Sequence, residues 1–229
     1  MSPFMYKIPP ATESELRHRV RAVAGKTLGQ LAAELGIKPP QNLRHNKGWQ
    51  GQLLELALGT TASTLPVPDF VELGIELKTI PVNGAGLPVE STYVCTVPLS
   101  NTHDQTWETS WVKQKLSQVL WIPVESEVGI ALTDRRIGQG LFWRPDAQQE
   151  RVLREDWEEL MDMVCLGQLE QITARHGRVL QIRPKAANAR ALTTTSDADG
   201  LTSQTLPRGF YLRSRFTRQI LEQHYILPA

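Results

Sequence analysis

The chain has 229 residues, of which 41% are hydrophobic and 21% are charged, and its formal net charge is +1. These values are typical of a folded globular protein, and the length suffices for one domain or two closely packed lobes. No apolar run approaches the roughly 18 residues that a membrane span requires, and residues 1–7 lack the basic-then-apolar order of a secretion signal. We therefore expect a cytoplasmic protein in which both cysteines, Cys95 and Cys165, are reduced core residues without zinc-ligand spacing.

The first third of the chain predicts three helices, over residues 13–24, about 27–36 and 48–58. Thr12 and Thr27 are suitable N-cap residues for the first two helices, and Gly25 and Gly36 end them. Glu55 lies among the leucines of the third helix. A carboxylate there usually faces solvent, although it can also point towards a bound cation.

The remaining chain alternates short strands with helices. A strand over residues 73–82, a turn-rich loop and a second strand over residues 92–97 form a hairpin pattern. Beyond it we expect helices over residues 109–117, 148–166, 168–174 and 217–224, strands over 120–124, 140–143, 178–183 and 210–212, and a polar loop over 193–200. The long helix carries one apolar stripe that we expect to be core, formed by Leu153, Trp157, Leu160, Met161 and Val164. This order predicts a mixed α/β (α+β) fold with a central sheet flanked by helices.

The charges are segregated along the chain. From Arg175 onward, nine Lys or Arg residues stand against Asp197, Asp199 and Glu222, so the remaining chain is net negative. The acidic residues concentrate in residues 150–162, which hold six carboxylates and two arginines. Such segregation lets one face approach a phosphate backbone while another meets a different partner, although simple solvated surfaces have the same pattern.

One short segment indicates metal-dependent chemistry. Glu76 and Lys78 project from the same face of the predicted strand, about 7 Å apart along it, and Asp69 precedes that strand. Two carboxylates about 4 Å apart repel by about 4 kcal/mol at an effective dielectric near 20, so a cation such as Mg²⁺ would stabilise the pair. Lys78 would then hold a water or stabilise charge on a phosphorus undergoing attack. By spacing alone, a solvated strand edge is the commoner explanation.

Other motifs do not support a different chemistry. Gly25-Lys26-Thr27 resembles the end of a phosphate-binding loop, but it follows a helix and the glycine required five positions earlier is Val20. There is no Gly-x-Ser-x-Gly motif, and the five histidines do not pair at metal-ligand spacing.

Several longer segments, in this order, resemble the MutH family, the strand-discriminating endonucleases of methyl-directed mismatch repair. They are Lys47-Gly48-Trp49, Leu54-Glu55, Asp69-Phe70, and residues 74–81, 120–124, 154–161, 182–188 and 206–212. The resemblance extends from about residue 12 to the C-terminus and is far more specific than the three charged residues alone.

The resemblance implies a restriction-endonuclease-like fold in a single domain, residues 1–229. Its N-terminal lobe (about 12–105) and C-terminal lobe (about 106–229) would form a DNA cleft. It also implies Mg²⁺-dependent nicking of the unmethylated strand, 5′ to the G of hemimethylated GATC sites.

The family's catalytic positions correspond to Asp69, Glu76 and Lys78, with Glu55 and Lys115 as additional residues near the metal and the reacting phosphate. The metal would be held by Asp69, Glu76 and the backbone carbonyl of Leu77. The DNA-binding positions correspond to Lys47, Tyr93, Arg183, Pro184, Lys185 and Tyr211. Among these, Tyr211 is expected to sense adenine methylation, unless it is a core strand tyrosine. Tyr93 replaces the family's Phe, and the loop over residues 83–87 is divergent, so no contact is assigned to it.

The resemblance further implies double-stranded DNA as substrate and activation by MutL, with MutS acting through it, on what is expected to be a monomer. The C-terminal helix and the acidic 150–162 helix are both candidate surfaces for MutL. A type II restriction endonuclease making double-strand cuts and a non-catalytic DNA-binding adaptor remain the alternatives.

Overall fold

The computed structural model describes residues 8–40, 48–60, 67–99, 105–185, 192–196 and 201–225. The chain forms two compact units. Unit 1 comprises the described residues within Met1–Glu90, Ser117–Arg144 and Ile220–Ala229, and unit 2 those within Ser91–Leu116 and Pro145–Gln219. The chain therefore enters each unit more than once, which differs from the single lobe boundary near residue 105 that we expected.

Three helices of unit 1 match the three that the sequence predicts: α1 (Glu13–Val23), α2 (Leu28–Glu34) and α3 (Trp49–Leu58). The Thr12 hydroxyl accepts a hydrogen bond from the Glu15 amide at 3.1 Å, and Thr27 forms a reciprocal capping box with Gln30. These bonds satisfy amide groups that have no partner within the helix, which is why both helices begin where the threonines predict.

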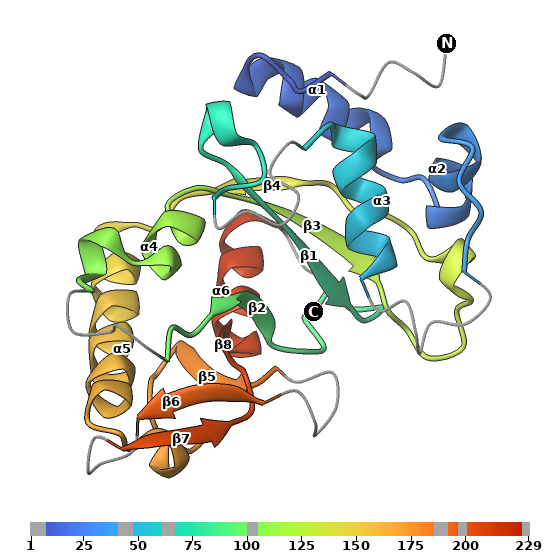
Figure 1. Ribbon diagram of the computed structural model, residues 1–229. Helices are drawn as coiled ribbons and strands as arrows, with labels where there is room; N and C mark the ends of the chain where they lie inside the picture. The colour runs from blue at the N-terminus through green and yellow to red at the C-terminus, as the bar shows by residue number, and fades with distance from the viewer. Residues whose placement is uncertain are drawn as a thin grey trace. The chain divides into compact units, whose positions relative to one another are not determined.

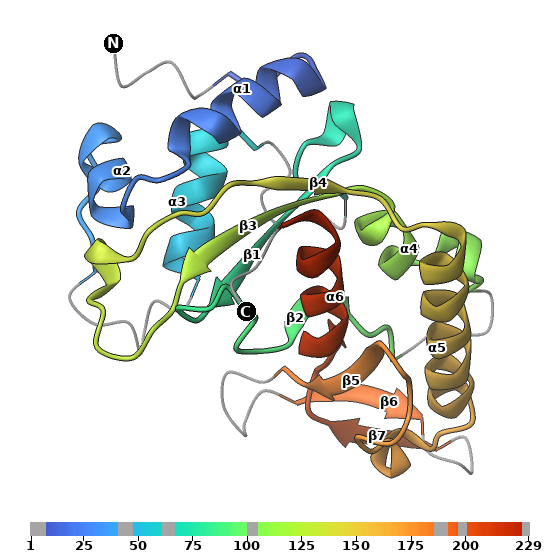
Figure 2. The same cartoon turned by 180° about the vertical axis from the view of Figure 1, so that it is seen from behind.

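The sheet of unit 1 has the order β1-β3-β4 and is mixed. Strand β1 (Glu76–Val82) pairs in parallel with β3 (Val119–Glu125), and β3 pairs antiparallel with β4 (Leu141–Trp143). Residues 119–122 of the central strand are all buried, as expected of a strand covered on both faces. Pro81 is tolerated because β1 is an edge strand of this sheet. One hydrophobic core joins β1 and β3 to all three helices (Figures 1 and 2).

The predicted hairpin between residues 73–82 and 92–97 is wrong. After β1 the chain turns back at once. Asn83 Oδ1 accepts bonds from the amides of Ala85 (3.1 Å) and Leu87 (3.0 Å), and Pro88 forms an isolated bridge with Val82. Strand β2 (Thr92–Thr96) belongs to a different sheet. Local turn signals predict the turn correctly but do not reveal the partner of the strand that follows it.

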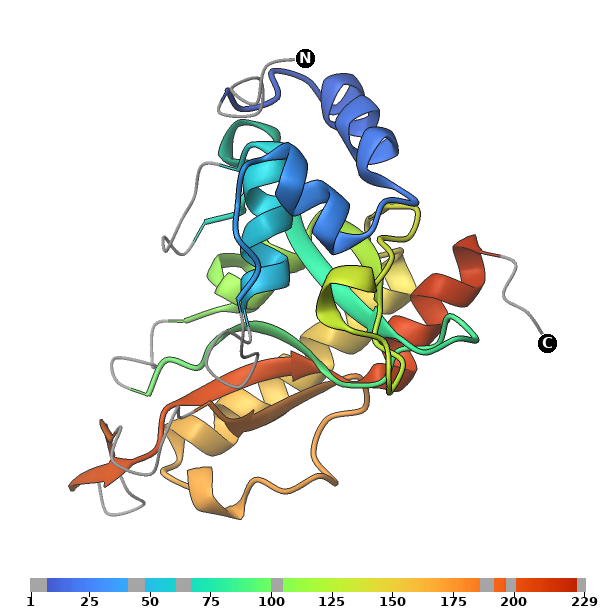
Figure 3. The ribbon, with the colours of Figure 1, turned by 90° about the vertical axis from the view of Figure 1, so that its right-hand side faces the viewer.

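Unit 2 contains an antiparallel sheet of order β2-β8-β5, with β8 (Arg208–Leu212) between β2 and β5 (Leu180–Pro184). Its helices are α4 (Trp111–Leu116) and α5 (Ala147–Cys165), which lies beside the sheet (Figure 3). The apolar stripe predicted on α5 is buried, which confirms its assignment to the core. The last helix, α6 (Ser214–His224), begins in unit 2 and ends in unit 1.

Several local predictions require correction. Residues expected as a polar loop form β6 (Thr193–Ser196), which pairs with β7 (Thr202–Thr205), because threonine is β-branched and favours extended backbone. The described strands therefore form three sheets rather than one central sheet, although the mixed α/β class is correct. Cys95 is buried as predicted, but Cys165 is exposed at the end of α5, beside the stripe rather than within it.

None of the helices in the described residues combines the length and the apolar character that a membrane crossing requires.

Candidate active site

A tight turn in unit 1 brings Asp69 beside the start of β1. The turn contains the 3-10 segment η2 (Val71–Leu73) and closes through two backbone bonds between Phe70 and Ile75, of 2.9 and 3.3 Å. Gly74 ends η2 at φ 64°, a conformation that glycine adopts without steric cost. As a result, the Asp69 carboxylate accepts a hydrogen bond of 2.8 Å from the Leu77 amide. The aspartate that the sequence places before the strand thus lies directly against it.

Glu76 and Lys78 form an ion pair on β1. The Lys78 Nζ lies 2.5 Å from Glu76 Oε1, and the two side chains are 13% and 2% exposed. Their spacing of two residues places them on the same side of the strand, as the sequence predicts. Parallel pairing with β3 fixes this end of β1, because the Glu76 amide donates to the Gln118 carbonyl at 3.0 Å. A carboxylate that is almost fully buried requires compensating charge or donors, and Lys78 supplies one positive charge.

Glu55 is half-buried on α3, the helix that packs against β1. Its carboxylate folds back along its own helix, since a Cβ atom placed at Gly51 would lie 4.0 Å from Glu55 Oε1. Across the described residues, no three His, Cys, Asp or Glu side chains gather closely enough to hold a metal ion. Asp69, Glu76 and Glu55 therefore do not form a single three-carboxylate group in this structure.

The donors near β1 fit Mg²⁺ in chemical type. Asp69 and Glu76 supply carboxylate oxygens and Leu77 supplies a backbone carbonyl, and Mg²⁺ commonly binds one or two carboxylates while retaining waters and phosphate oxygens. The almost complete burial of the Glu76 side chain is a second reason to expect a cation here, because a cation beside it would offset the cost of burying its charge.

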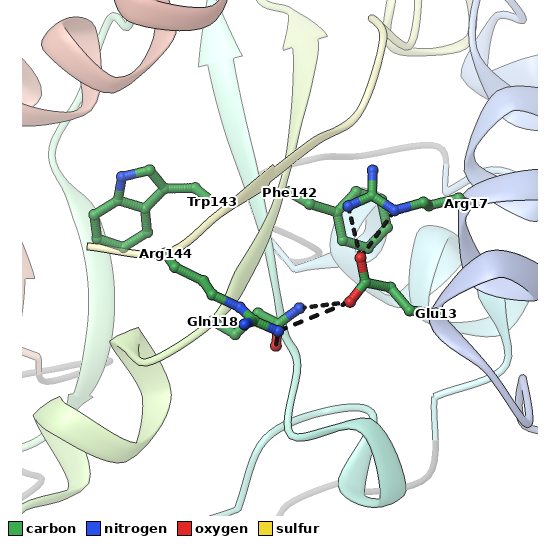
Figure 4. A pocket seen from close by; sticks show the side chains of 6 residues that line it. All are labelled: Glu13, Arg17, Gln118, Phe142, Trp143 and Arg144. Atoms are coloured by element: carbon green, nitrogen blue, oxygen red, sulfur yellow. Dashed lines mark hydrogen bonds and ion pairs between the residues drawn. The ribbon is translucent and has the colours of Figure 1, made fainter. Parts of the chain in front are cut away.

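A polar network in unit 1 holds Gln118, whose backbone carbonyl accepts the hydrogen bond from the Glu76 amide. The Gln118 side chain donates to Glu13 at 3.1 Å and accepts from Arg144 at 2.7 Å, and Arg17 binds Glu13 at 2.6 Å. These side chains converge on a pocket of about 380 Å³ (Figure 4). The hydrogen bond from Arg17 is the main cause that lowers the pKa of Glu13 below its ordinary value. Sequence patterns did not identify this network, because its members come from α1, from the residue before β3 and from the residue after β4.

Four of the predicted DNA-binding residues form one cluster on the sheet of unit 2. Tyr93 and Tyr211 are paired across β2 and β8, with ring centres 5.4 Å apart in an edge-to-face arrangement. Lys185 Nζ lies 3.6 Å from the centre of the Tyr93 ring, and the Arg183 guanidinium carbon lies 5.6 Å from the centre of the Tyr211 ring. Both tyrosines are half-buried and both cations are exposed. Tyr211 is therefore not a core residue, and the cluster offers aromatic and cationic groups together.

Gly209 is a residue of this cluster that sequence reasoning missed as part of the site. A Cβ atom at this position would lie 2.9 Å from Tyr93 Cε2 and 3.1 Å from Tyr211 Cε2. Only glycine lets the two rings approach the backbone of β8 this closely. The sequence does show a glycine two residues before Tyr211, in the segment Pro207-Arg208-Gly209-Phe210-Tyr211. Its role beside both rings follows only from the pairing of β2 with β8.

The remaining predicted residues are placed as follows. Pro184 is exposed at the end of β5, opposite Arg208 of β8, and Lys115 is half-buried on α4 of unit 2. Lys47 lies outside the described residues.

Comparison with known proteins identifies the family to which the chain belongs. A model of the family described as "DNA mismatch repair enzyme MutH" matches residues 58–156. The chain is 54% identical over 221 residues to the DNA mismatch repair protein MutH of Enterobacter sp. (strain 638), with 96% of each chain covered. It is also 54% identical over 219 residues, again 96% of each chain, to the DNA mismatch repair protein MutH of Escherichia coli (strain K12). Because such identity extends over almost the entire length, the chain belongs to the MutH family of DNA mismatch repair enzymes.

Proposed function

We propose that the chain is a Mg²⁺-dependent endonuclease that nicks the unmethylated strand of hemimethylated GATC sites, 5′ to the G. The observation that carries this proposal is the hydrogen bond between Asp69 and Leu77, next to the ion pair of Lys78 with the buried Glu76. Membership of a DNA mismatch repair family supports the substrate, and a restriction-endonuclease-like fold with a DNA cleft is part of the same proposal.

In this mechanism Asp69, Glu76 and the Leu77 carbonyl would hold the metal ion, while Glu55 and Lys115 would assist near the metal and the phosphate. When bound, Mg²⁺ would stabilise charge on the phosphoryl oxygens and lower the pKa of the attacking water. The Leu77 amide holds the Asp69 carboxylate in position before substrate arrives. Lys78, which pairs with Glu76, would donate to the attacking water or to a phosphate oxygen and so stabilise the charge that develops during attack.

We assign recognition of the GATC sequence to residues of unit 2, and Lys47 adds a further contact with DNA. Arg183 and Lys185 carry the donors that read guanine O6 and N7, and a good bidentate contact discriminates by about 1–3 kcal/mol. The half-buried Tyr211 ring can pack against an unmodified adenine and reject one with a methyl group on its amino nitrogen. Pro184 and Tyr93 complete the contact surface. Lys185 and Arg183 lie over the two rings, so they orient these rings and add positive charge towards DNA.

A strand-resolved nicking assay tests the proposal. GATC duplexes that are unmethylated, hemimethylated or fully methylated are incubated with Mg²⁺ or with EDTA. We expect nicks in the unmethylated strands, resistance of the fully methylated duplex, and no product in EDTA. Simultaneous double-strand cuts irrespective of methylation would instead indicate a type II restriction enzyme. Binding without nicks would indicate an adaptor.

We also propose that the protein acts as a cytoplasmic monomer and is activated by MutL, which relays the mismatch signal from MutS. An unregulated enzyme of this specificity would nick every transiently hemimethylated site, so activation by a partner has a physical purpose. The test is nicking of a mismatch-containing duplex with and without MutL and MutS, and an unchanged rate would refute this part of the proposal.

A further inference from the structure

Asp156 of α5 is a buried carboxylate that the candidate metal site does not use. Its side chain is 2% exposed, and its Oδ2 atom accepts hydrogen bonds from the backbone amides of Val179 (2.6 Å) and Leu180 (2.8 Å). These amides belong to residues 174–180, the segment that leads into β5, which we call the β5 entry. The cost of burying this carboxylate is therefore offset by backbone donors at the point where a strand begins.

The β5 entry is also held by neighbouring side chains. One turn after Asp156 on the same face of α5, the Glu159 carboxylate accepts a bond of 3.0 Å from the Gly177 amide. Gly177 has φ 70°, and a Cβ atom there would collide with the backbone of the β5 entry itself. Arg213 Nη2, at the end of β8, donates to the carbonyls of Ala174 (2.8 Å) and His176 (2.9 Å). Side chains from α5 and from the end of β8 thus determine the path of this segment.

Strand β5 begins where the β5 entry ends and carries Arg183, whose guanidinium carbon lies 5.6 Å from the centre of the Tyr211 ring. Gln181 is paired with Tyr211, and Arg183 with Gly209. Because strand side chains alternate, a slip of one residue would place Ile182 rather than Arg183 on this face. Strand β5 is at the edge of its sheet, so within the described residues only β8 holds its register by strand pairing. The starting point of β5 therefore decides which side chains reach the tyrosine ring.

We propose that Asp156 is a positioning residue for sequence recognition, because it fixes the point at which β5 begins. A slip of one residue moves every amide of a strand by about 3.3 Å, so both bonds to the carboxylate would break and leave buried donors unpaired. The carboxylate therefore favours the register in which Arg183 faces Tyr211. This inference rests on the proposed reading of GATC by Arg183, and it adds a residue that does not itself contact DNA.

The test compares the affinities of the chain for a GATC duplex and for a duplex in which the G is replaced by A. Affinities are measured by fluorescence anisotropy in Ca²⁺, which limits cleavage. Asp156→Ala removes the acceptor, so we expect the preference for GATC to fall by about tenfold or more, with the affinity for the altered duplex nearly unchanged. Asp156→Asn keeps an acceptor oxygen and should largely restore the preference. Asp162→Ala is the matched control, because it truncates an exposed carboxylate of the same helix, and it should leave the preference unchanged.

A double-variant cycle separates positioning from a purely structural role. If Asp156 acts through Arg183, the combination of Asp156→Ala with Arg183→Ala should reduce the GATC preference no more than Arg183→Ala does alone. Additive losses would overturn the proposal. A lowered urea-unfolding midpoint in Asp156→Ala with an unchanged GATC preference would also overturn it, because Asp156 would then stabilise the fold without affecting recognition.

Hydrogen exchange provides a measurement that needs no variant, and it applies even if Asp156→Ala does not fold. In the unmodified chain without DNA, the amides of Val179 and Leu180 should exchange as slowly as those of β8, and rapid exchange would overturn the proposal. An unmodified chain without preference for GATC would refute the proposed recognition and this inference together. Equal preference in the unmodified chain and in Asp156→Ala would remove only the role of Asp156.

Discussion

Replacing Gly209 with alanine should change the geometry of the cluster formed by Tyr93, Tyr211, Arg183 and Lys185. The new Cβ would lie 2.9 Å from Tyr93 Cε2 and 3.1 Å from Tyr211 Cε2. Carbon atoms pack favourably at about 3.5–4.0 Å, so at least one ring must move by roughly 0.5 Å or more. Loss of the edge-to-face pair costs about 0.5–1.5 kcal/mol. If DNA binding requires both rings in their present geometry, restoring that geometry on binding costs this free energy, which corresponds to roughly two- to tenfold weaker binding.

The assay is fluorescence anisotropy with a GATC duplex in Ca²⁺, which limits cleavage, together with urea unfolding of the same samples. Tyr93→Phe is the matched control, because it keeps the ring and removes only the hydroxyl that bonds Thr96 at 3.0 Å. We expect the control to bind DNA within twofold of the unmodified chain. DNA affinity of Gly209→Ala equal to that of the unmodified chain would refute the assignment of the ring pair to the DNA-contacting surface.

Three further predictions address other parts of the chain. Lys78→Met should lower the nicking rate by about 10²-fold or more, because it removes the cation beside Glu76, and DNA binding measured in Ca²⁺ should persist; an unchanged rate would exclude Lys78 from the mechanism. The hydrogen bond from Arg17 is the main cause that lowers the pKa of Glu13 from its ordinary value of 4.5, so the stabilising contribution of Glu13 is present above pH 4.5 and lost as the pH falls below it; Glu13→Gln should reduce the loss of urea-unfolding midpoint on acidification. Burial raises the pKa of Tyr225 to about 12, so its contribution is present below the unfolded value of 10.0 and lost as the pH rises from 10.0 to about 12; Tyr225→Phe should reduce the fall in stability over this range, and identical pH profiles would contradict the burial of its phenol.

The elements that the sequence predicts best are those determined by local chemistry. Thr12 and Thr27 begin their helices because a threonine hydroxyl reaches an amide three residues later. The apolar stripe of α5 is buried because its period matches the helix. The approach of Asp69 to β1 is similarly local, since η2 and Gly74 complete the turn within a few residues.

The failures involve contacts between distant segments. Strand β2 pairs with β8, more than a hundred residues later, and nothing in its own turn signals distinguishes that partner from β1. The fit of Gly209 between Tyr93 and Tyr211 depends on the same pairing. Asp156 belongs to the acidic run of α5, yet it is 2% exposed and accepts bonds from the amides of Val179 and Leu180. Charge patterns alone do not separate such a buried acceptor from a solvated carboxylate.

The central claim about the molecule is that Asp69 and Glu76 bind a divalent ion, and this binding can be measured without any cleavage. Mn²⁺ binding to the protein–DNA complex can be measured by electron paramagnetic resonance for the unmodified chain, for Asp69→Asn and for Glu76→Gln. We expect a bound ion in the unmodified chain and at least tenfold weaker binding in each variant, with DNA affinity retained. Equal Mn²⁺ affinity in all three proteins would contradict the claim that Asp69 and Glu76 hold the metal.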